Sequence, residues 1–129
     1  MKMLRKNMAK LLVVEDNLVN QKLMRKILES LNNEVVCVST GEEAWALISS
    51  QMQFDLIFLD MHLPKMDGFE LAGKIKLLFG NQTKIIAVTA MAMSGDKEKV
   101  LEAGCDDYIS KPIFINEIKE VLSKYLGGN

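Results

Sequence analysis

Three acidic residues follow two apolar stretches of the sequence. Glu15 and Asp16 come directly after the run Leu11–Val14, and Asp60 comes directly after the run Leu56–Leu59. If both runs are parallel strands of one sheet, their carboxyl ends bring the three carboxylates to one edge. Two like charges about 4 Å apart repel by roughly 4 kcal/mol at an effective dielectric constant near 20. Such a cluster therefore needs a proton, a cation or a basic side chain beside it.

Two further polar residues are expected at the same edge. Thr89 follows the run Lys84–Val88, and Lys111 lies just beyond the run Asp106–Ile109. Carboxylate oxygens suit Mg²⁺, which typically takes one or two carboxylates, a phosphate oxygen and several waters. A hydroxyl and an ammonium group could hold other phosphoryl oxygens, because phosphoryl transfer depends mainly on positioning and charge neutralisation. These residue types predict a site for Mg²⁺ and a phosphoryl group.

Alternating strands and helices are needed to position these residues. The predicted strands are Lys10–Val14, Glu34–Val38, Leu56–Leu59, Lys84–Val88 and Asp106–Ile109. Helical spacing follows each of them, with a capping box at Thr40 and Glu43. The first, third and fourth strands are apolar throughout, which is typical of a parallel sheet covered on both faces. We predict an α/β fold, a flavodoxin-like doubly wound five-stranded parallel sheet of order 2-1-3-4-5 with five helices.

Length and composition fit a single domain. The chain has 129 residues, 49% of them apolar and 26% charged, which suits one hydrophobic core. A formal net charge of −1 and a pI near 5.9 argue against a nucleic-acid-binding module, which normally carries a basic excess. We expect a tail or linker remnant over 1–9, the domain over 10–126 and a short tail over 127–129.

Targeting signals and cysteine motifs are not evident in the sequence. The first nine residues lack the apolar stretch of a signal peptide, and no segment has the 18 or so apolar residues of a membrane span. Cys37 and Cys105 fit small core residues better than a redox or zinc motif. We therefore expect a cytoplasmic protein that contacts neither membrane nor nucleic acid directly.

Four stretches of the sequence resemble the receiver domain of two-component response regulators. They are Val14–Asn17, Leu59–Gly68, Val88–Ala90 and Tyr108–Pro112. The resemblance covers about residues 10–126, and residues 14–21 and 89–112 look most similar to receivers attached to hybrid histidine kinases. It implies phosphorelay signalling, in which Asp60 accepts a phosphoryl group from the phosphohistidine of a histidine kinase or a histidine phosphotransfer protein.

The resemblance also implies the ligands of the metal and of the phosphoryl group. Asp16 and Asp60 would bind Mg²⁺ directly, Glu15 would bind it through a water, and the backbone carbonyl of His62 would complete the protein ligands. Lys111 would pair with the phosphoryl group. The backbone N–H groups that would donate to this group belong to Met61 and Ala90.

A conformational switch is implied as well. Thr89 would move to hydrogen-bond the phosphoryl group, Tyr108 would change position with it, and a cis peptide bond would precede Pro112. The switch would alter the surface formed by the fourth helix, the fifth strand and the fifth helix, a surface through which a homodimer could also form. The residues expected to leave the start of the fourth helix mobile are Met91, Met93 and Gly95.

The lifetime of the phosphorylated state is expected to be long. His62 and Met91 would flank the approach of water to Asp60, and family members with quick dephosphorylation carry small, carboxamide or acidic groups there. We therefore expect slow self-dephosphorylation. The protein is also expected to catalyse its own phosphoryl transfer, without turnover of an external substrate. The His62 side chain is expected to be neither a catalytic base nor a metal ligand.

Other functions fit the sequence less well. A flavodoxin shares the sheet order, but the acidic pair after the first strand would repel its flavin phosphate. A haloacid-dehalogenase-type phosphatase carries its nucleophile after the first strand, typically as Asp-x-Asp, whereas Asp60 follows the third. A pseudo-receiver, a binding module that signals without phosphorylation, is the main alternative. The set that argues against it is Asp16, Asp60, Thr89 and Lys111.

Overall fold

A computed structural model of the chain describes residues 8–90 and 96–127. The strands are β1 (Lys10–Val14), β2 (Glu34–Val38), β3 (Leu56–Asp60), β4 (Lys84–Thr89) and β5 (Asp107–Ser110). The helices are α2 (Leu18–Ser30), α3 (Gly41–Ser49), α4 (Gly68–Phe79), α5 (Asp96–Ala103) and α6 (Ile115–Leu126). No helix among these residues is long and apolar enough to cross a bilayer.

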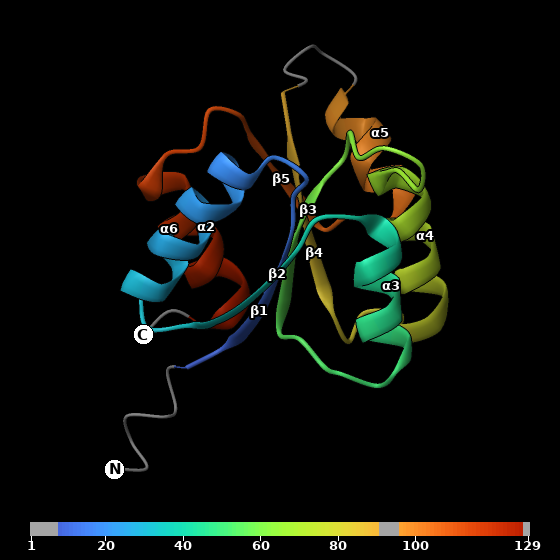
Figure 1. The fold of residues 1–129 in the computed structure, drawn as a ribbon, viewed down its shortest axis with the longest axis horizontal. Coiled ribbons are helices and arrows are strands. Elements are labelled where there is room, and N and C mark those ends of the chain that lie inside the picture. Colours follow the sequence, from blue (N-terminus) through green and yellow to red (C-terminus); the bar gives the residue numbers. More distant parts are fainter. Residues whose placement is uncertain (1–7, 91–95, 128–129) are drawn as a thin grey trace.

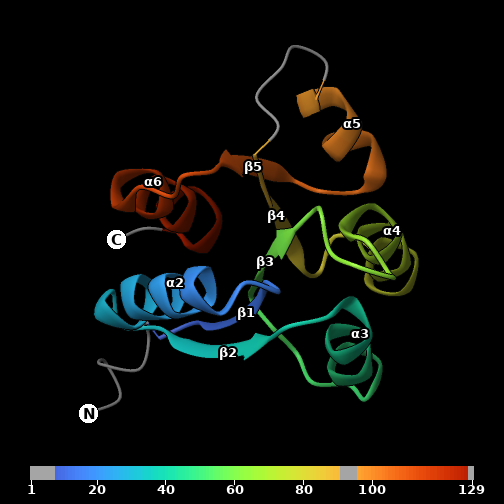
Figure 2. The same cartoon turned by 45° about the horizontal axis from the view of Figure 1, so that its top comes forward.

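The predicted sheet is confirmed. All five strands are parallel and lie in the order β2-β1-β3-β4-β5. Helices α2 and α6 cover one face of the sheet, and α3, α4 and α5 cover the other (Figure 1, Figure 2). The strand order reverses between β1 and β3, and folds with such a reversal typically carry their functional site at the carboxyl ends of the two strands that flank it.

The strand bounds differ from the predicted ones by one residue at four places. β3 and β4 each extend to the polar residue that follows the apolar run, because Asp60 pairs with Val88 and Thr89 pairs with Ser110. β5 begins and ends one residue later than predicted, because it spans Asp107–Ser110. Asp106 still contacts β4, because its N–H donates to the Ile85 carbonyl at 2.7 Å and its side chain accepts a hydrogen bond from the Ile85 N–H at 2.8 Å.

Two apolar layers hold the sheet between its helices. Successive strand residues point to opposite faces, so Leu12 and Ile57 pack in the layer of α3 and α4, whereas Leu11 and Phe58 pack in the layer of α2 and α6. All four side chains are buried. Between their polar ends, the central strands are continuously apolar because they have a covered face on each side.

Side-chain caps fix where the helices begin. Asn17 caps α2, Asp67 caps α4, and Thr40 and Glu43 form the predicted capping box of α3. A capping side chain satisfies an otherwise unpaired N–H in the first turn of a helix. Since Asn17 follows Asp16 directly, its cap also sets where the loop after β1 ends.

Helices α3 and α4 are neighbours in their layer. The Lys74 Nζ of α4 lies 4.7 Å from the centroid of the Trp45 ring of α3, within the range of a cation–π interaction.

Gly68 brings the start of α4 against the end of β3. A Cβ atom at this position would lie 2.6 Å from the Met61 Cα and 2.7 Å from the Asp60 carbonyl oxygen. The Gly68 N–H also donates to the Met61 carbonyl at 3.3 Å. The first turn of α4 is thus locked against the backbone of Asp60.

We expect Gly68→Ala to lower the free energy of unfolding by about 1–3 kcal/mol, the usual cost of forcing atoms into a packed site. Gly73 lies in the same helix, and a Cβ there would meet only the Ala103 carbonyl oxygen at 3.9 Å. Gly73→Ala should therefore raise the free energy of unfolding, by about 0.5–1 kcal/mol. Urea denaturation measures both changes. Equal stability of the two variants would contradict the close approach at Gly68.

Candidate functional site

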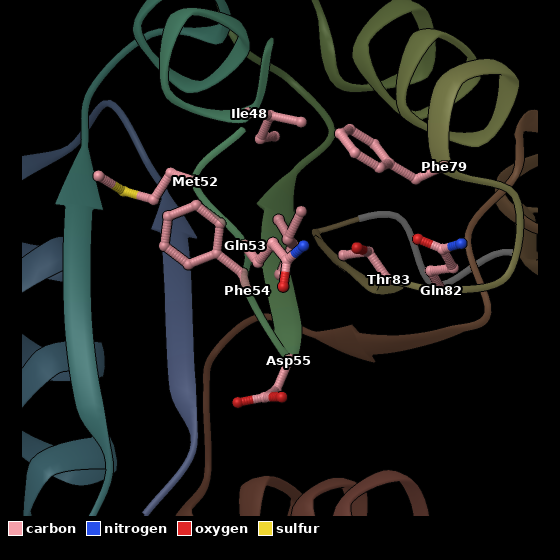
Figure 3. Close-up of a pocket in the computed structure, with 9 residues that line it drawn as sticks. Ile48, Met52, Gln53, Phe54, Asp55, Phe79, Gln82 and Thr83 are labelled. Carbon is pink, nitrogen blue, oxygen red and sulfur yellow. The ribbon is translucent and has the colours of Figure 1, made fainter. Parts of the chain in front are cut away.

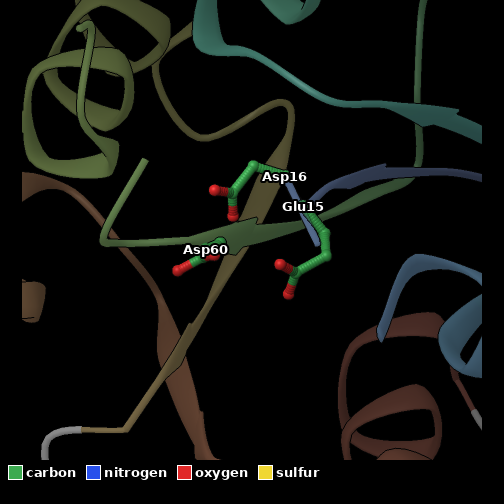
Figure 4. A group of neighbouring side chains, drawn as sticks. All are labelled: Glu15, Asp16 and Asp60. Carbon is green, nitrogen blue, oxygen red and sulfur yellow. The ribbon is translucent and has the colours of Figure 1, made fainter. Parts of the chain in front are cut away.

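The three predicted acids meet at the carboxyl edge of the sheet (Figure 4). Glu15 and Asp16 follow β1, and Asp60 ends β3, the neighbouring strand. Each residue offers one carboxylate oxygen, and these oxygens lie within 4.8 Å of one another. Glu15 and Asp60 are each only 3% exposed, whereas Asp16 is exposed to solvent. The set is all oxygen and partly open to solvent, which suits a hard cation such as Mg²⁺.

Lys111 is the basic side chain that balances this cluster. Its Nζ lies 3.1 Å from Glu15 Oε1 and 3.4 Å from Asp60 Oδ2. Its backbone N–H donates to the Thr89 carbonyl at 2.8 Å, and the Lys111–Pro112 peptide bond is cis, as the resemblance implies. One ammonium group therefore bridges two buried carboxylates. The contact with Glu15 was not foreseen from the sequence, because only the fold brings the two residues together.

The electrostatics of the cluster follow from burial and from these contacts. Burial raises the pKa of Glu15 above its ordinary value of 4.5, and the neighbouring charge of Asp60 raises this pKa further; hydrogen bonds from the Asn17 N–H and from Lys111 oppose the shift. Partial burial lowers the pKa of Lys111, but the hydrogen bond to Glu15 and the charge of Asp60 outweigh it, so this pKa lies above 10.5. Lys111 is therefore charged at neutral pH, and Glu15 keeps its proton to a higher pH than an ordinary carboxyl group.

The two backbone N–H groups that follow Asp60 both have hydrogen-bond partners in this structure. The His62 N–H donates to Asp60 Oδ1 at 2.9 Å, and the His62 side chain is exposed. The Met61 N–H donates to the Val88 carbonyl at 3.2 Å. Met61 thus continues the β3–β4 hydrogen-bond ladder in this structure, and its role as a phosphoryl donor stays a prediction.

The predicted switch residues lie on β4, which neighbours the strand of Asp60, and on β5, the next strand beyond it. Thr89 is buried at the end of β4, Ala90 is exposed beside it, and Tyr108 is half-buried in β5. The Nζ atom of Lys97, in α5, lies 5.9 Å from the centroid of the Tyr108 ring. Movement of Thr89 and Tyr108 stays a prediction. The residues Met91, Met93 and Gly95, to which a mobile helix start was assigned, lie outside the described residues.

Gln21 is a site residue that sequence reasoning missed. Its side chain, on α2, donates to the Glu15 carbonyl at 2.8 Å. The sequence offers one signal for it. Gln21 precedes Met24 and Leu28, the buried residues of α2, at helical spacing, so a polar residue occupies the buried face of an amphipathic helix.

A pocket of about 330 Å³ lies at the opposite edge of the sheet (Figure 3). It is lined by residues at the end of α3 and at the starts of β3 and β4, among them Phe54, Asp55 and Thr83. None of the three clustered acids lines it. This pocket is therefore separate from the acidic cluster at the carboxyl edge.

Comparison with known proteins gives a family match over most of the chain. A family model described as the response regulator receiver domain matches residues 11–123. Among curated proteins, the chain is 43% identical over 126 residues to the hybrid signal transduction histidine kinase L of Dictyostelium discoideum. That match covers 93% of this chain and 7% of the kinase, so the chain spans a small part of this relative.

Solved structures are similar over the same region. The receiver domain of the sensor histidine kinase PA1611 from Pseudomonas aeruginosa, which has a magnesium ion coordinated in its active-site cleft, is 37% identical with a TM-score of 0.81; the match covers 92% of this chain and 98% of that one. A Saccharomyces cerevisiae co-crystal structure holds the histidine phosphotransfer protein Ypd1 and the receiver domain of its downstream response regulator Ssk1. It matches at 29% identity with a TM-score of 0.83, and the match covers 91% of this chain and 88% of the chain in that structure.

The electrostatics of the cluster can be tested in the metal-free protein. We expect the pKa of Glu15 to lie above 4.5, to fall in Asp60→Asn because a like charge is lost, and to rise in Lys111→Met because an opposite charge is lost. Titration of the Glu15 carboxyl carbon by NMR measures the three values. A wild-type pKa at or below 4.5 would contradict the dominance of burial.

The raised pKa also has a consequence for stability. Native Glu15 binds its proton more tightly than the unfolded chain does, so ionised Glu15 costs stability above its native pKa. Relative to Glu15→Gln, the free energy of unfolding of the wild type should therefore rise as the pH falls from 7 through the native pKa of Glu15 toward the pKa of Glu15 in the unfolded chain.

Proposed function

Since the chain belongs to the receiver domain family of two-component response regulators, we propose that Asp60 is its phosphoacceptor. The observation that carries this proposal is the contact of Lys111 with two buried carboxylates at the carboxyl edge of the sheet. Asp60 lies at the end of a buried strand. The Lys111 ammonium group contacts one of its carboxylate oxygens, and the His62 N–H donates to the other. Its carboxylate is thus held in place for reaction.

The proposed reaction is a transfer between two side chains. A carboxylate oxygen of Asp60 attacks the phosphorus of a phosphohistidine, so a P–O bond forms as the P–N bond breaks. The leaving imidazole keeps the electron pair of the broken bond and takes up a proton. Lys111 then pairs with the phosphoryl oxygens, while Thr89 and the N–H of Ala90 hold the remaining oxygens. This is self-catalysed chemistry without turnover of an external substrate.

A metal site completes the proposal. Asp16 and Asp60 would hold Mg²⁺ directly, Glu15 through a water, and the His62 backbone carbonyl would be the fourth protein contact. Bound there, Mg²⁺ would neutralise charge on the transferring phosphoryl group. The oxygen-only donor set within 4.8 Å supports this assignment, as does the magnesium ion in the cleft of the PA1611 receiver domain.

The partner would be a histidine kinase or a histidine phosphotransfer protein, as in the Ypd1–Ssk1 complex. An exposed apolar surface flanks the site, because α2 begins just after Asp16 and α6 begins just after Pro112. It consists of Leu18, Val19, Leu23, Phe114 and Ile115. We propose that a phosphotransfer protein docks on this surface and brings its histidine to Asp60. A homodimer would use another surface, formed by α5, β5 and α6.

Two further expectations belong to this proposal. Slow self-dephosphorylation stays a prediction, because Met91, one of the two flanking residues, lies outside the described part of the chain. A cytoplasmic location is supported by the two free cysteines, Cys37 and Cys105, since unpaired thiols suit a reducing compartment.

The phosphoacceptor is tested with acetyl phosphate and Mg²⁺, followed by intact-mass spectrometry. The wild type and Asp55→Asn should each gain one phosphoryl group, because Asp55 lies at the far edge of the sheet. Asp60→Asn should gain none. Phosphorylation of Asp60→Asn would overturn the assignment, and an unlabelled wild type would favour the pseudo-receiver alternative.

The docking surface is tested with a matched pair of substitutions. Val19 is 75% exposed on α2, and Leu77 is 91% exposed on α4, in the layer on the other face of the sheet. The donor is a phosphotransfer protein that phosphorylates the wild type. Val19→Glu should lower the rate of transfer from this donor roughly tenfold, equivalent to about 1.4 kcal/mol. Leu77→Glu should leave that rate unchanged, and neither variant should alter labelling by acetyl phosphate. Equal rates for Val19→Glu and the wild type would exclude this surface.

A further inference from the structure

Gln21 connects α2 to the ends of two strands. Its Nε2 donates to the Glu15 carbonyl at 2.8 Å, to the Val38 carbonyl at 3.2 Å and to Ser39 Oγ at 3.3 Å. The side chain is half-buried, so these bonds are partly shielded from competing water. The amide therefore holds the end of β1 against the end of β2 from the side of the helix.

The Glu15 carbonyl belongs to the peptide group that joins Glu15 to Asp16. A peptide group is planar and its atoms move together, so a hydrogen bond to its oxygen restrains the whole group, the Asp16 Cα included. The other side of the Glu15 backbone is held as well, because the Glu15 N–H donates to the Val38 carbonyl at 3.1 Å. Gln21 thereby restrains the backbone from which the exposed Asp16 carboxylate extends.

We infer that Gln21 is a positioning residue for the cation site, acting through Asp16. This inference rests on the proposed function, in which Asp16 binds Mg²⁺ directly. Gln21 does not touch the metal in this scheme. Its amide keeps the Asp16 carboxylate at the distance from Asp60 that one ion can bridge, and a site held in advance loses less entropy on binding. Groups that orient metal ligands in this way commonly change metal affinity by 10–100-fold when removed.

The same helix offers a matched control. Arg25 lies one turn further along α2, and its Nη1 donates to the Val35 carbonyl of β2 at 3.2 Å. This bond also seats α2 on β2, but it is remote from the peptide between Glu15 and Asp16. A purely structural role of Gln21 would therefore be reproduced by Arg25→Met, whereas a positioning role would not.

The experiment measures Mg²⁺ affinity by calorimetry in the wild type, Gln21→Met and Arg25→Met, at a temperature where circular dichroism shows all three folded. Gln21→Met keeps an unbranched side chain of similar length and removes the donor. We expect it to weaken Mg²⁺ binding roughly tenfold, and Arg25→Met to stay within about twofold of the wild type. In the metal-free proteins, the Glu15 carbonyl ¹³C resonance should shift in Gln21→Met and not in Arg25→Met.

Each outcome separates the two proposals. If the wild type does not bind Mg²⁺, the proposed function fails. If the wild type binds Mg²⁺ and folded Gln21→Met binds it equally well, only the inference about Gln21 is wrong. The same holds if Gln21→Met and Arg25→Met weaken Mg²⁺ binding equally. Should Gln21→Met not fold, Gln21→Asn serves instead, because it keeps the amide but is one methylene too short to reach the Glu15 carbonyl. Its affinity should fall in the same direction, and wild-type affinity in that variant would overturn the inference.

Discussion

The site depends on the contact of one ammonium group with two buried carboxylates. Burial makes ionised Glu15 and Asp60 costly, and Lys111 offsets that cost only if it reaches both of them. The three residues come from the ends of β1 and β3 and from the segment beyond β5. A small shift of any of these strands would separate the ammonium group from the carboxylates. The close contact of these charges therefore requires a rigid sheet.

The apolar layers provide this rigidity. Central strands that are packed on both faces cannot slide without moving side chains in two cores at once. Gly68 then locks α4 against the backbone of Asp60, and Asn17 starts α2 one residue after Asp16. The core and the helix caps therefore hold the polar edge from several sides. The edge itself is left with a partly open, acidic surface.

Much of this arrangement follows from the sequence, because apolar runs and caps are local signals. The sheet order, the capping box at Thr40 and the meeting of Glu15, Asp16 and Asp60 were all predicted. Strand ends were less accurate at Asp60 and Thr89, since a polar side chain ends an apolar run although the backbone still pairs. The contact of Lys111 with Glu15 is not local, and only the folded sheet brings the two together.

One site residue was missed, and one assigned role stays a prediction, for different reasons. A single polar residue on the apolar face of α2 gives too weak a signal to assign Gln21 a partner. The donor role of Met61 came from family resemblance and stays a prediction, and in this structure the N–H of Met61 donates to the Val88 carbonyl within the sheet ladder. Both cases concern backbone groups, whose hydrogen-bond partners depend on the register of neighbouring strands.

The contact between Trp45 and Lys74 has a practical consequence for spectroscopy. The chain contains one tryptophan, and its ring lies where α3 meets α4. Its fluorescence is therefore a local reporter of one helical layer, from elements that contribute no member of the acidic cluster. Circular dichroism averages over the helices of both layers. Agreement between the two signals during denaturation would show that the layers unfold as one cooperative unit, and divergence would reveal that one layer loosens before the other.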